Sequence, residues 1–581
     1  MLKNVKSSVL ENPVGLMLDK GARDLTSTSR RSLASRDEGR STPIARLAKI
    51  RPCSALSGVR YGASAYCAKA IRQAILTSTA GLVALGGAQA ADIPVKVRPV
   101  EYVKICSPYG AGFYYIPGAD TCIKLGGYLR ADLLLGSNSY VVNPVSGVGA
   151  AHNRLSNYYT TRSREDLNID TRTATEYGVV RTFFDATFTW TAGGYAGAGT
   201  TALNGSTAYT GAPAGTSGSG SIAGGALGVY FAFIQFAGFT VGKAISQFSS
   251  PWTNYPANIF DGLPGSGSAV TGVNQISYTA DFGQGIAATI SAQDPTAYYQ
   301  TNIWNTTGAT ATGILTGAYG TQNFGGSRAP DIVGMVRVDQ AWGLFQASVA
   351  AHNNHAAYYG ATETSGAPGD KWGWAAQLAL SIKNIPTGAG DSINLQGVYT
   401  NGASMYDIQE NMPNTWAMYG GTRRVGAYQS IGFAGVSDAV YSGIAATNGT
   451  ALDLTTTYGF NAGYNHNWNA HWSSGVYGGW AAVRYSGAAK AQICGSAGMV
   501  ALGLTGVCNP DFNIAAVGTI TRWTPVKNLT FSADVFASFL DQKYSGTITA
   551  PTVAVVAKPA AAYELKNQAA LSMLLRIQRN W

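Results

Sequence analysis

The chain has 581 residues, of which 12% are charged and 11% aromatic, and it contains 72 glycines. Soluble domains carry about 25% charged residues, and runs rich in Leu, Glu and Lys are nearly absent after residue 90, so the composition excludes an ordinary multidomain cytosolic enzyme. The net charge of +10 does not indicate a nucleic-acid-binding domain, because residues 1–90 hold 14 Lys and Arg against 5 Asp and Glu, which leaves the rest of the chain nearly neutral.

Residues 66–90 have the three parts of a Sec signal peptide. Lys69 and Arg72 supply the positive start, residues 74–87 supply the apolar core, and a small-residue cleavage site, Ala-Gln-Ala, precedes Ala91. We therefore expect export across a membrane and a mature chain that begins at Ala91.

The segment before this signal, residues 1–65, is rich in Ser and Arg and has no hydrophobic period. We expect it to be disordered, or to reflect a start site assigned too far upstream. A true cytoplasmic extension is the alternative, but it would hinder export. The domain expected to fold is therefore residues 91–581.

Four of the six cysteines lie in the exported part of the chain, and they are Cys106, Cys122, Cys494 and Cys508. An even number of cysteines in an oxidising compartment indicates disulfides. Of the three possible connectivities, we favour Cys106 with Cys122 and Cys494 with Cys508, because these pairs close short loops. A metal site would need thiolates closer in sequence with histidines nearby, so we expect no metal and no cofactor.

Residues 122–136, CIKLGGYLRADLLLG, alternate between two faces. Side chains alternate with period two in a strand, so Leu125, Leu129 and Leu133 point one way while Arg130 and Asp132 point the other. One face is apolar and the other charged, which predicts a strand with two different environments.

The uncharged stretch 221–242 is apolar enough to suggest a membrane helix. Glycine recurs too often in it for a helix, and β-branched and aromatic residues flank Ala237 and Gly238. We therefore predict two strands joined by a tight turn at these two residues.

A repeated hairpin layout follows. In residues 274–294, Ile276 and Tyr278 face one way before a turn at 281–285, and Ile286 resumes the apolar face after it. The same layout returns with turns at 339–343, 384–391, 467–469 and 524–528. Long loops rich in Gly, Ser, Thr and Asn separate the hairpins. Short turns that alternate with long loops are typical of an antiparallel up-and-down transmembrane β-barrel.

Bilayer physics accounts for this pattern. Every backbone N–H and C=O in hydrocarbon needs an internal partner, so a spanning sheet must close on itself, with apolar residues toward lipid and polar residues toward a wet lumen. A soluble β-sandwich or solenoid also alternates, but no fixed repeat supports a solenoid, and the signal peptide, low charge and many Tyr and Trp favour the membrane. We therefore expect an all-β transmembrane barrel.

The chain ends in a strand-like segment, ALSMLLRIQRNW. Met573, Leu575, Ile577 and Trp581 share one face that we expect to meet lipid, although Arg579 interrupts the series near the water boundary. Chains inserted by the outer-membrane assembly machinery typically end in an aromatic residue on such a strand, so we predict that Trp581 is the assembly signal.

Five motifs resemble the alphaproteobacterial general porins, the Omp2-like family of rhizobia and Brucella relatives. The motifs are AADIPVKVRPVEYVKICSPYGAGFYYIPGADTCIKLGGYLRADL (90–133), TTRSREDLNIDTRTATEYGVVRTF (160–183), FAFIQFAGFTVGKA (231–244), VDQAWG (338–343) and LRIQRNW (575–581). The resemblance spans residues 88–581. It implies a 16-stranded barrel and a homotrimer in the outer membrane, in contact with lipid and lipopolysaccharide. It also implies passive diffusion of small hydrophilic solutes and ions. The family usually ends in Phe rather than Trp, and the leader has no counterpart in it.

Selectivity in a channel comes from pore width and from charged rings at the constriction. The side chains that alternation places on the lumen face are Lys124, Arg130, Arg162, Arg164, Asp166, Arg181 and Asp185. Asp170 and Arg172 share that parity, but we expect them at the rim because they fall near the hairpin turn.

The resemblance implies that residues 244–272 form an inward-folded loop that narrows the barrel. Asp261 is the one charged residue after Lys243 in this loop. Opposite several arginines it would give modest selectivity that leans toward anions. The alternative is that the loop packs against the inner wall and Asp261 caps a turn.

No enzyme is expected. His352 and His355 have a spacing that does not bring two imidazoles together on a strand, and no Ser or His lies in a recognisable catalytic context. Two other functions remain as alternatives to a general diffusion channel: a substrate-specific channel lined by aromatic residues, and an adhesin or receptor that acts through its long loops.

Overall fold

The computed structural model describes residues 104–136, 151–154, 159–192, 221–222, 225–252, 254–258, 263–267, 271–296, 298–408 and 414–581. The expected leader and signal peptide, residues 1–90, and Asp261 lie outside these residues. Side chains are not discussed for the few strand-end residues 191–192, 221–222 and 225–226, nor for residue 555.

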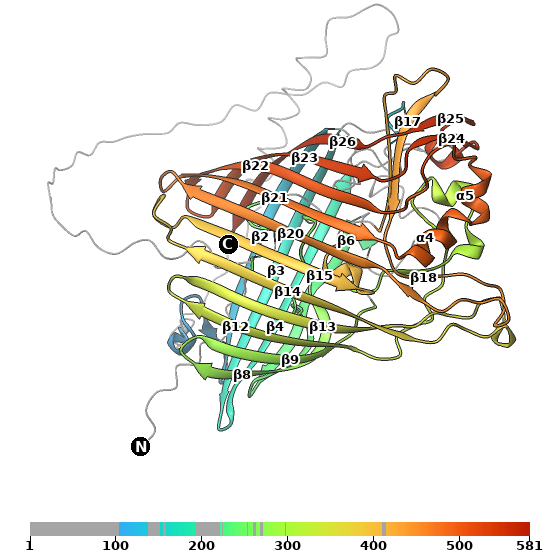
Figure 1. Ribbon diagram of the computed structural model, residues 1–581. Helices are drawn as coiled ribbons and strands as arrows, with labels where there is room; N and C mark the ends of the chain where they lie inside the picture. Colours follow the sequence, from blue (N-terminus) through green and yellow to red (C-terminus); the bar gives the residue numbers. More distant parts are fainter. Residues whose placement is uncertain are drawn as a thin grey trace, which may run out of the picture. The chain divides into compact units, whose positions relative to one another are not determined.

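Sixteen strands of the described chain form one closed antiparallel β-barrel, as predicted (Figure 1). Each strand pairs with the next one along the ring, and the last pairs with the first. The strands are β2 (Thr121–Gly136), β3 (Tyr159–Thr175), β4 (Gly178–Ala192), β6 (Gly225–Phe236), β7 (Phe239–Ala244), β8 (Val273–Gly283), β9 (Ile286–Gln293), β12 (Asp331–Gln340), β13 (Gly343–Asn354), β14 (Lys371–Lys383), β15 (Ser392–Asn401), β20 (Thr456–Asn467), β21 (Trp472–Arg484), β22 (Phe512–Val526), β23 (Leu529–Gln542) and β26 (Gln568–Asn580). Two-residue strands β1 (Tyr114–Tyr115) and β5 (Ser221–Ile222) pair antiparallel with β2 and β6.

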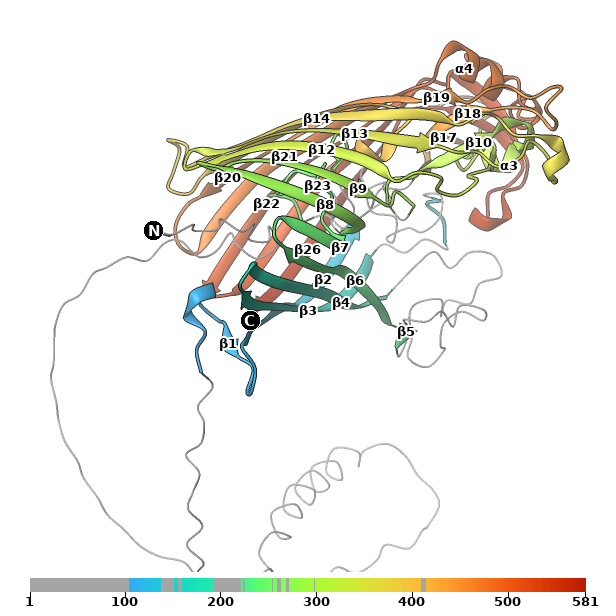
Figure 2. The same ribbon diagram turned by 90° about the horizontal axis from the view of Figure 1, so that it is seen from below.

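The ring closes at the seam between β2 and β26, which Figure 2 shows side by side. In this register Asp132 lies opposite Arg576, and Tyr128 lies opposite Asn580. Closure leaves no free strand edge in the wall, which is the condition for a sheet to lie in hydrocarbon.

Short turns join the strands at one end of the barrel and long loops join them at the other (Figure 1). The turn at Ala237 and Gly238 joins β6 to β7, which confirms the two strands and the tight turn predicted in this apolar stretch. Each of the five further turns predicted from the hairpin layout falls between two adjacent strands. In the described chain no helix has the length and apolar character needed to cross a membrane.

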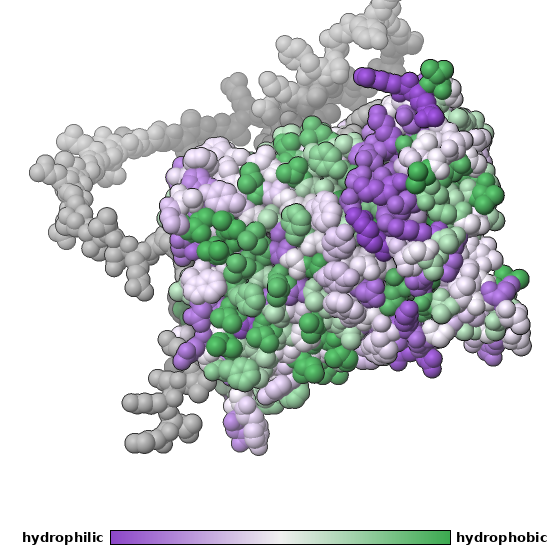
Figure 3. Space-filling model, in the orientation of Figure 1, coloured by the Kyte–Doolittle hydropathy of each residue, from purple (hydrophilic) through white to green (hydrophobic). Residues whose placement is uncertain are grey.

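The outer face of the barrel wall is apolar, and Figure 3 shows apolar residues gathered over the wall strands. On β14, Leu378 is 60% exposed and Trp374 47% exposed, whereas their neighbours Gln377 and Ala375 on the other face are 2% and 1% exposed. The same alternation occurs on β13, with Val349 exposed and Ser348 buried. Exposed apolar side chains on one face of a closed sheet are explained by contact with lipid.

The long loops fold into a compact layer, which the sequence patterns did not predict. One small sheet contains β10 (Asn302–Asn305), β11 (Thr321–Gln322), β18 (Ser437–Tyr441) and β19 (Asp453–Leu454), and the other contains β16 (Thr415–Gly420), β17 (Gln429–Gly435), β24 (Gly546–Ala550) and β25 (Ala561–Leu565). The described loops also contain the helices α3 (Ala311–Ile314), α4 (Gly487–Cys494) and α5 (Ala497–Ala501) and the 3-10 turns η3 (Thr306–Gly308), η4 (Glu363–Ser365), η5 (Ser404–Tyr406) and η6 (Ala554–Val556). A further 3-10 turn, η1 (Ser107–Tyr109), lies before β1.

This loop layer has its own apolar core, which extends down one side of the barrel interior. Trp416 and Phe433 of the loops pack in one cluster with Phe512 and Phe536, which point inward from β22 and β23. The barrel wall is therefore dry on part of its inner face and polar elsewhere. Removing this much apolar surface from water supplies the driving force that orders the loops.

Both predicted disulfides are present. Cys106 bonds Cys122 and ties the segment before β1 to the start of β2, and Cys494 bonds Cys508 across the loop that contains α4 and α5.

Candidate functional site

Arginines from β26, β2 and β3 converge on the lumen face of the seam. We call Arg130, Arg162, Arg164 and Arg576 the arginine cluster. Asp132 lies directly opposite both Arg162 and Arg576, and Arg130 lies directly opposite Arg164. Residues opposite each other on adjacent strands have Cβ atoms roughly 5 Å apart, so the four guanidinium groups occupy one patch.

One carboxylate serves two of these arginines. The Asp132 carboxylate accepts hydrogen bonds from Arg162 Nη2 at 2.8 Å and from Arg576 Nε at 2.6 Å, and its side chain is fully buried. Arg130 donates to Gln578 at 2.9 Å, and Arg164 donates to Thr189 at 2.9 Å and to the Tyr230 hydroxyl at 2.8 Å. Arg162 and Arg576 therefore share one buried carboxylate.

Two further carboxylates lie beside the cluster. Asp166 of β3 and Asp185 of β4 are 3% exposed each, and their carboxyl groups contact each other. Asn168, which lies opposite Asp185, donates to Asp166 at 3.3 Å. The structure therefore brings Asp166 and Asp185 together with the arginines, so that both signs of charge line one part of the lumen.

The other lumen candidates lie nearer the end of the short turns. Lys124 is six residues before Arg130 on the same face, roughly 20 Å along the strand, and its amine lies 5.8 Å from the Phe113 ring. Arg181 binds Asp170 through two hydrogen bonds of 3.0 Å, and Arg172 binds the same carboxylate. These groups form a second cluster toward that rim.

The loop between β7 and β8 lies against the inner face of the barrel. We call its described residues, 245–252, 254–258 and 263–267, the inner segment. Gln346 and Gln377, which point inward from β13 and β14, donate to the backbone oxygens of Ser249 at 3.0 Å and Phe248 at 2.8 Å. The inner segment is therefore held by side chains of the polar face.

A second set of contacts anchors the inner segment near the arginine cluster. The Asn258 backbone N–H donates to Asp534 of β23 at 2.6 Å, and the Asn258 backbone oxygen accepts from Arg576 Nη2 at 3.1 Å. Arg522 of β22 donates to the backbone oxygen of Pro256. Arg576 thus joins the inner segment to the seam. Asp261, the expected acidic partner of the arginines, lies outside the described residues.

Sequence reasoning missed Arg576, Arg522 and Asp534. The signal was present, because Arg576 alternates with Leu575 and Ile577 in the last strand, and the period that placed Arg130 inside also places Arg576 inside. The contacts of Asn258 had no such signal, since they join residues 274 or more positions apart.

The inner segment also rests on the loop between β15 and β20. The backbone N–H groups of Gly265 and Ser266 both donate to the backbone oxygen of Asp407 at 3.1 Å. The Asp407 side chain is fully buried against β20, and this burial raises its pKa to about 8, although a hydrogen bond from Thr457 acts in the opposite direction. A carboxylic acid at this junction is therefore neutral at pH 7.

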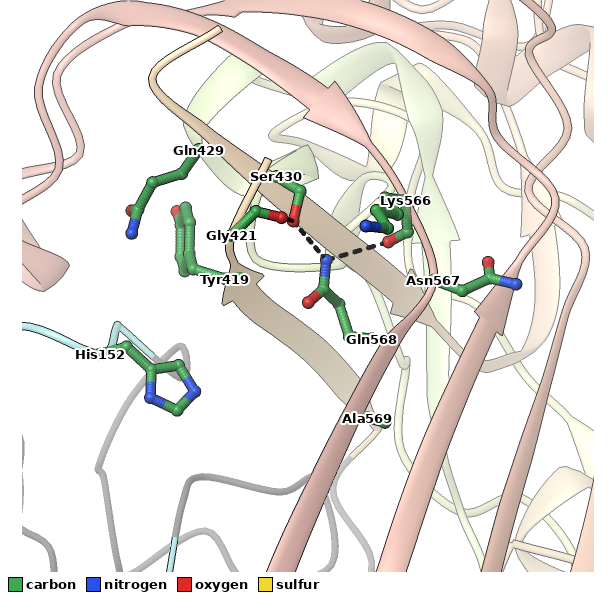
Figure 4. Close-up of a pocket in the computed structure, with 10 residues that line it drawn as sticks. His152, Tyr419, Gly421, Gln429, Ser430, Lys566, Asn567, Gln568 and Ala569 are labelled. Atoms are coloured by element: carbon green, nitrogen blue, oxygen red, sulfur yellow. Dashed lines mark hydrogen bonds between the residues drawn. The ribbon is translucent and has the colours of Figure 1, made fainter. Parts of the chain in front are cut away.

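A polar pocket of about 420 Å³ lies where β26 begins (Figure 4). The Gln568 amide donates to Ser430 Oγ and to the backbone oxygen of Lys566, each at 3.1 Å, and so links the barrel wall to the loop sheet. His152 faces this pocket across from Ser430 (Figure 4), and burial together with the charge of Lys558 lowers its pKa. Among the described residues no group of three or more His, Cys, Asp or Glu side chains is placed to hold a metal ion.

A closed 16-stranded barrel with an apolar outer face, a charged lumen and a loop folded inside defines an outer-membrane channel. The family model described as "Porin subfamily" matches residues 92–574, and the chain belongs to this family. Porin Omp2b of Brucella neotomae is 30% identical over 358 residues, which cover 61% of this chain and 80% of the relative, and Porin Omp2b of Brucella abortus (strain 2308) matches to the same extent.

Solved structures with a similar barrel include the outer-membrane channel DcaP of Acinetobacter baumannii, with a TM-score of 0.49 and 13% identity over 80% of this chain and 99% of that one. The anion-selective porin from Comamonas acidovorans has a TM-score of 0.38 and 10% identity over 79% of this chain and 100% of that one.

The protein is a general porin of the Gram-negative outer membrane. It forms a water-filled channel for passive diffusion of small hydrophilic solutes and ions, as the resemblance to Omp2-like porins implied. Membership of the family indicates a channel rather than an enzyme.

Proposed function

We propose that the arginine cluster and the inner segment form the constriction of this channel and make it weakly selective for anions. The observation that carries this proposal is that Arg130 and Arg164 lie directly opposite each other on β2 and β3. Like charges in such a pair destabilise a sheet, so their placement costs stability and calls for a functional explanation. A solute passing this patch meets four guanidinium groups, with Asp132, Asp166 and Asp185 as partial compensation.

Lys124, Arg181 and Asp261 complete the proposed lining. Lys124 and Arg181 would act toward the rim, where they add positive charge to the entrance without setting the narrowest width. Asp261 belongs to the loop that contributes the inner segment, and it would reduce the anion preference by facing the arginines.

The test is the reversal potential of the channel in a planar bilayer under a salt gradient. Arg130→Gln removes a charge whose guanidinium is bound by an amide rather than a carboxylate, so folding should tolerate it, and we expect the anion-to-cation permeability ratio to fall. Arg328→Gln is the matched control, because Arg328 has a 65% exposed side chain in a loop. An unchanged reversal potential in Arg130→Gln would remove the arginine cluster from the selectivity mechanism.

We also propose that the protein assembles as a homotrimer among lipid and lipopolysaccharide, after export by a Sec signal at residues 66–90 and insertion by the outer-membrane assembly machinery. Support comes from the family to which the chain belongs and from Trp581, which directly follows the last barrel strand and is 52% exposed. Residues 1–65 would be absent from the mature protein. N-terminal sequencing tests the cleavage site, for which we expect Ala91, and crosslinking in membranes tests the trimer.

A further inference from the structure

A histidine is buried between two carboxylates where the barrel wall meets the loop layer. His352 near the end of β13 has a side chain with no exposed surface, and its Nδ1 lies 2.8 Å from Asp331 Oδ1 of β12. Its Nε2 lies 3.7 Å from Asp438 Oδ2 of β18, and both carboxylates are also fully buried. In the part of the chain that the structure describes, His352 is the one cationic partner within 4.0 Å of either carboxylate.

Hydrogen bonds from the loop layer hold both carboxylates. Asp438 accepts hydrogen bonds from the Ser404 backbone N–H at 2.6 Å, from Ser404 Oγ at 2.8 Å and from the Thr301 backbone N–H at 2.8 Å. Asp331 accepts from the Tyr406 hydroxyl at 2.6 Å as well as facing the imidazole. Hydrogen bonds to an ionised carboxylate favour that form, and two buried anions without a cation are strongly unfavourable. The arrangement therefore requires an imidazolium.

The same two carboxylates hold one short piece of the loop layer. Residues 402–408, which include η5, lie between β15 and β20 and are buried over their whole length. Ser404 binds Asp438 and Tyr406 binds Asp331, so this piece is fixed at two points by the groups that face His352. The titratable groups that face the imidazole from the elements packed around it are Asp331, Asp438 and the Tyr406 phenol, and Tyr299 stacks on that phenol.

The other side of residues 402–408 carries the inner segment. The Asp407 backbone oxygen accepts from Gly265 and Ser266, Ile408 forms a bridge with Ser266, and the Tyr406 ring packs against Phe248 with ring centroids 4.6 Å apart. We call His352, Asp331 and Asp438 the charged triad. Residues 402–408 thus connect the charged triad to the inner segment in the lumen.

We propose that His352 is a positioning residue for the channel constriction: as an imidazolium between Asp331 and Asp438 it locks residues 402–408, and these residues hold the inner segment at its working position. The inference rests on the proposed role of the inner segment as the constriction. The positive charge of His352 has a structural role, and its loss loosens the inner segment in the lumen but not the barrel strands.

The test measures amide hydrogen exchange by mass spectrometry on the full folded protein in detergent micelles at one pH. His352→Gln leaves two buried carboxylates without a cation, and we expect exchange in residues 402–408 and 263–267 to become faster on the order of tenfold, while the barrel strands stay protected. His355→Gln is the matched control, because His355 pairs with Asp370 in a loop where both side chains are partly exposed.

A charge-balanced double variant separates charge from packing. His352→Gln with Asp438→Asn restores the net charge of the wild-type triad, so we expect exchange in residues 263–267 to return toward the wild-type rate. Failure of this rescue would overturn the proposal, because packing alone would then account for the single variant. If His352→Gln does not fold, Ser404→Ala removes one hydrogen bond to Asp438 without changing charge, and a smaller increase in exchange at both segments is expected. No increase in residues 263–267 would overturn the proposal.

Conductance distinguishes this inference from the proposed function. At neutral pH the single-channel current of the wild type should be steady, whereas that of His352→Gln should be noisy. If the current through His352→Gln channels is steady while Arg130→Gln changes the selectivity, the inference about His352 is overturned and the proposed function stands. Unaltered selectivity in Arg130→Gln would count against the constriction itself, whatever His352→Gln shows.

Discussion

Arg576 and Asp132 form an ion pair of 2.6 Å across the seam where the first and last barrel strands meet, and they are directly opposed in the strand register. The same arginine donates to the backbone of Asn258 in the inner segment. One side chain therefore contributes to barrel closure, to the charge of the lumen and to the position of the loop inside it.

Asp132→Ala should destabilise the barrel by about 3 kcal/mol, because it leaves two buried guanidinium groups without their carboxylate. The measurement is the free energy of unfolding in urea. The folded fraction at each urea concentration is read from gels, on which folded and unfolded barrels differ in mobility. Asp339→Ala is the control, since its ion pair with Lys383 is 3.8 Å long and exposed, and its cost should stay below about 1 kcal/mol. Equal costs for the two variants would contradict the structural role of the seam pair.

Leu378→Arg should impair folding into membranes, because Leu378 is 60% exposed on the apolar outer face near the middle of β14. A cation on the lipid face of a barrel costs about 2–4 kcal/mol at the bilayer midplane. Asn168→Arg on the lumen face of β3 is the matched control and should fold at the wild-type yield. Folding yield into lipid vesicles measures both, and equal tolerance of the two arginines would refute the assignment of the faces.

Asp407→Asn should make the protein more stable at neutral to mildly alkaline pH. A free Asp ionises at about pH 4, whereas buried Asp407 has a pKa of about 8. Between these values the folded state holds a proton that the unfolded state has lost, so wild-type stability falls as pH rises through this window and stops falling above it.

The amide of Asn cannot ionise, so the variant should gain about 2 kcal/mol or more over the wild type at pH 8 and little at pH 4. Unfolding free energies measured across this range check the prediction. Asp120→Asn removes a carboxyl at an exposed position and should parallel the wild type at every pH. If the stability profile of Asp407→Asn also parallels that of the wild type, the folded protein does not hold a proton on the Asp407 carboxyl group in this pH range.

Replacing Cys494 and Cys508 by serine should loosen the loop that contains α4 and α5. The disulfide closes a loop with a sequence separation of 14, and removing such a crosslink costs about 3 kcal/mol. Because Ile493 and Met499 of this loop belong to the apolar core of the loop layer, hydrogen exchange should rise there and in adjoining loop strands. Serine at Cys106 and Cys122 is the control and should leave α4 and α5 protected. Unchanged exchange in the first variant would contradict a stabilising role.

The sequence alone determined which face of each strand meets lipid and which meets water. Alternation with period two is a local property, because successive side chains point to opposite faces whatever the rest of the chain does. It was enough to place Arg130, Arg162, Arg164, Asp166 and Asp185 on the inner face and to locate the short turns, and an apolar face toward lipid then requires the sheet to close.

Only the tertiary structure decided which of these residues lie together. Arg576 reaches Asp132 because closing the barrel pairs the last strand with the first. Neither strand sequence alone specifies the register of this pairing. The loop layer was unpredictable for a related reason. Its apolar residues follow no period among the Gly and Thr, and they form a core only when loops from different hairpins meet above the barrel. His352 faces Asp331 across the hairpin of β12 and β13, but Asp438 reaches it only because the folded chain brings β18 of the loop layer beside β13.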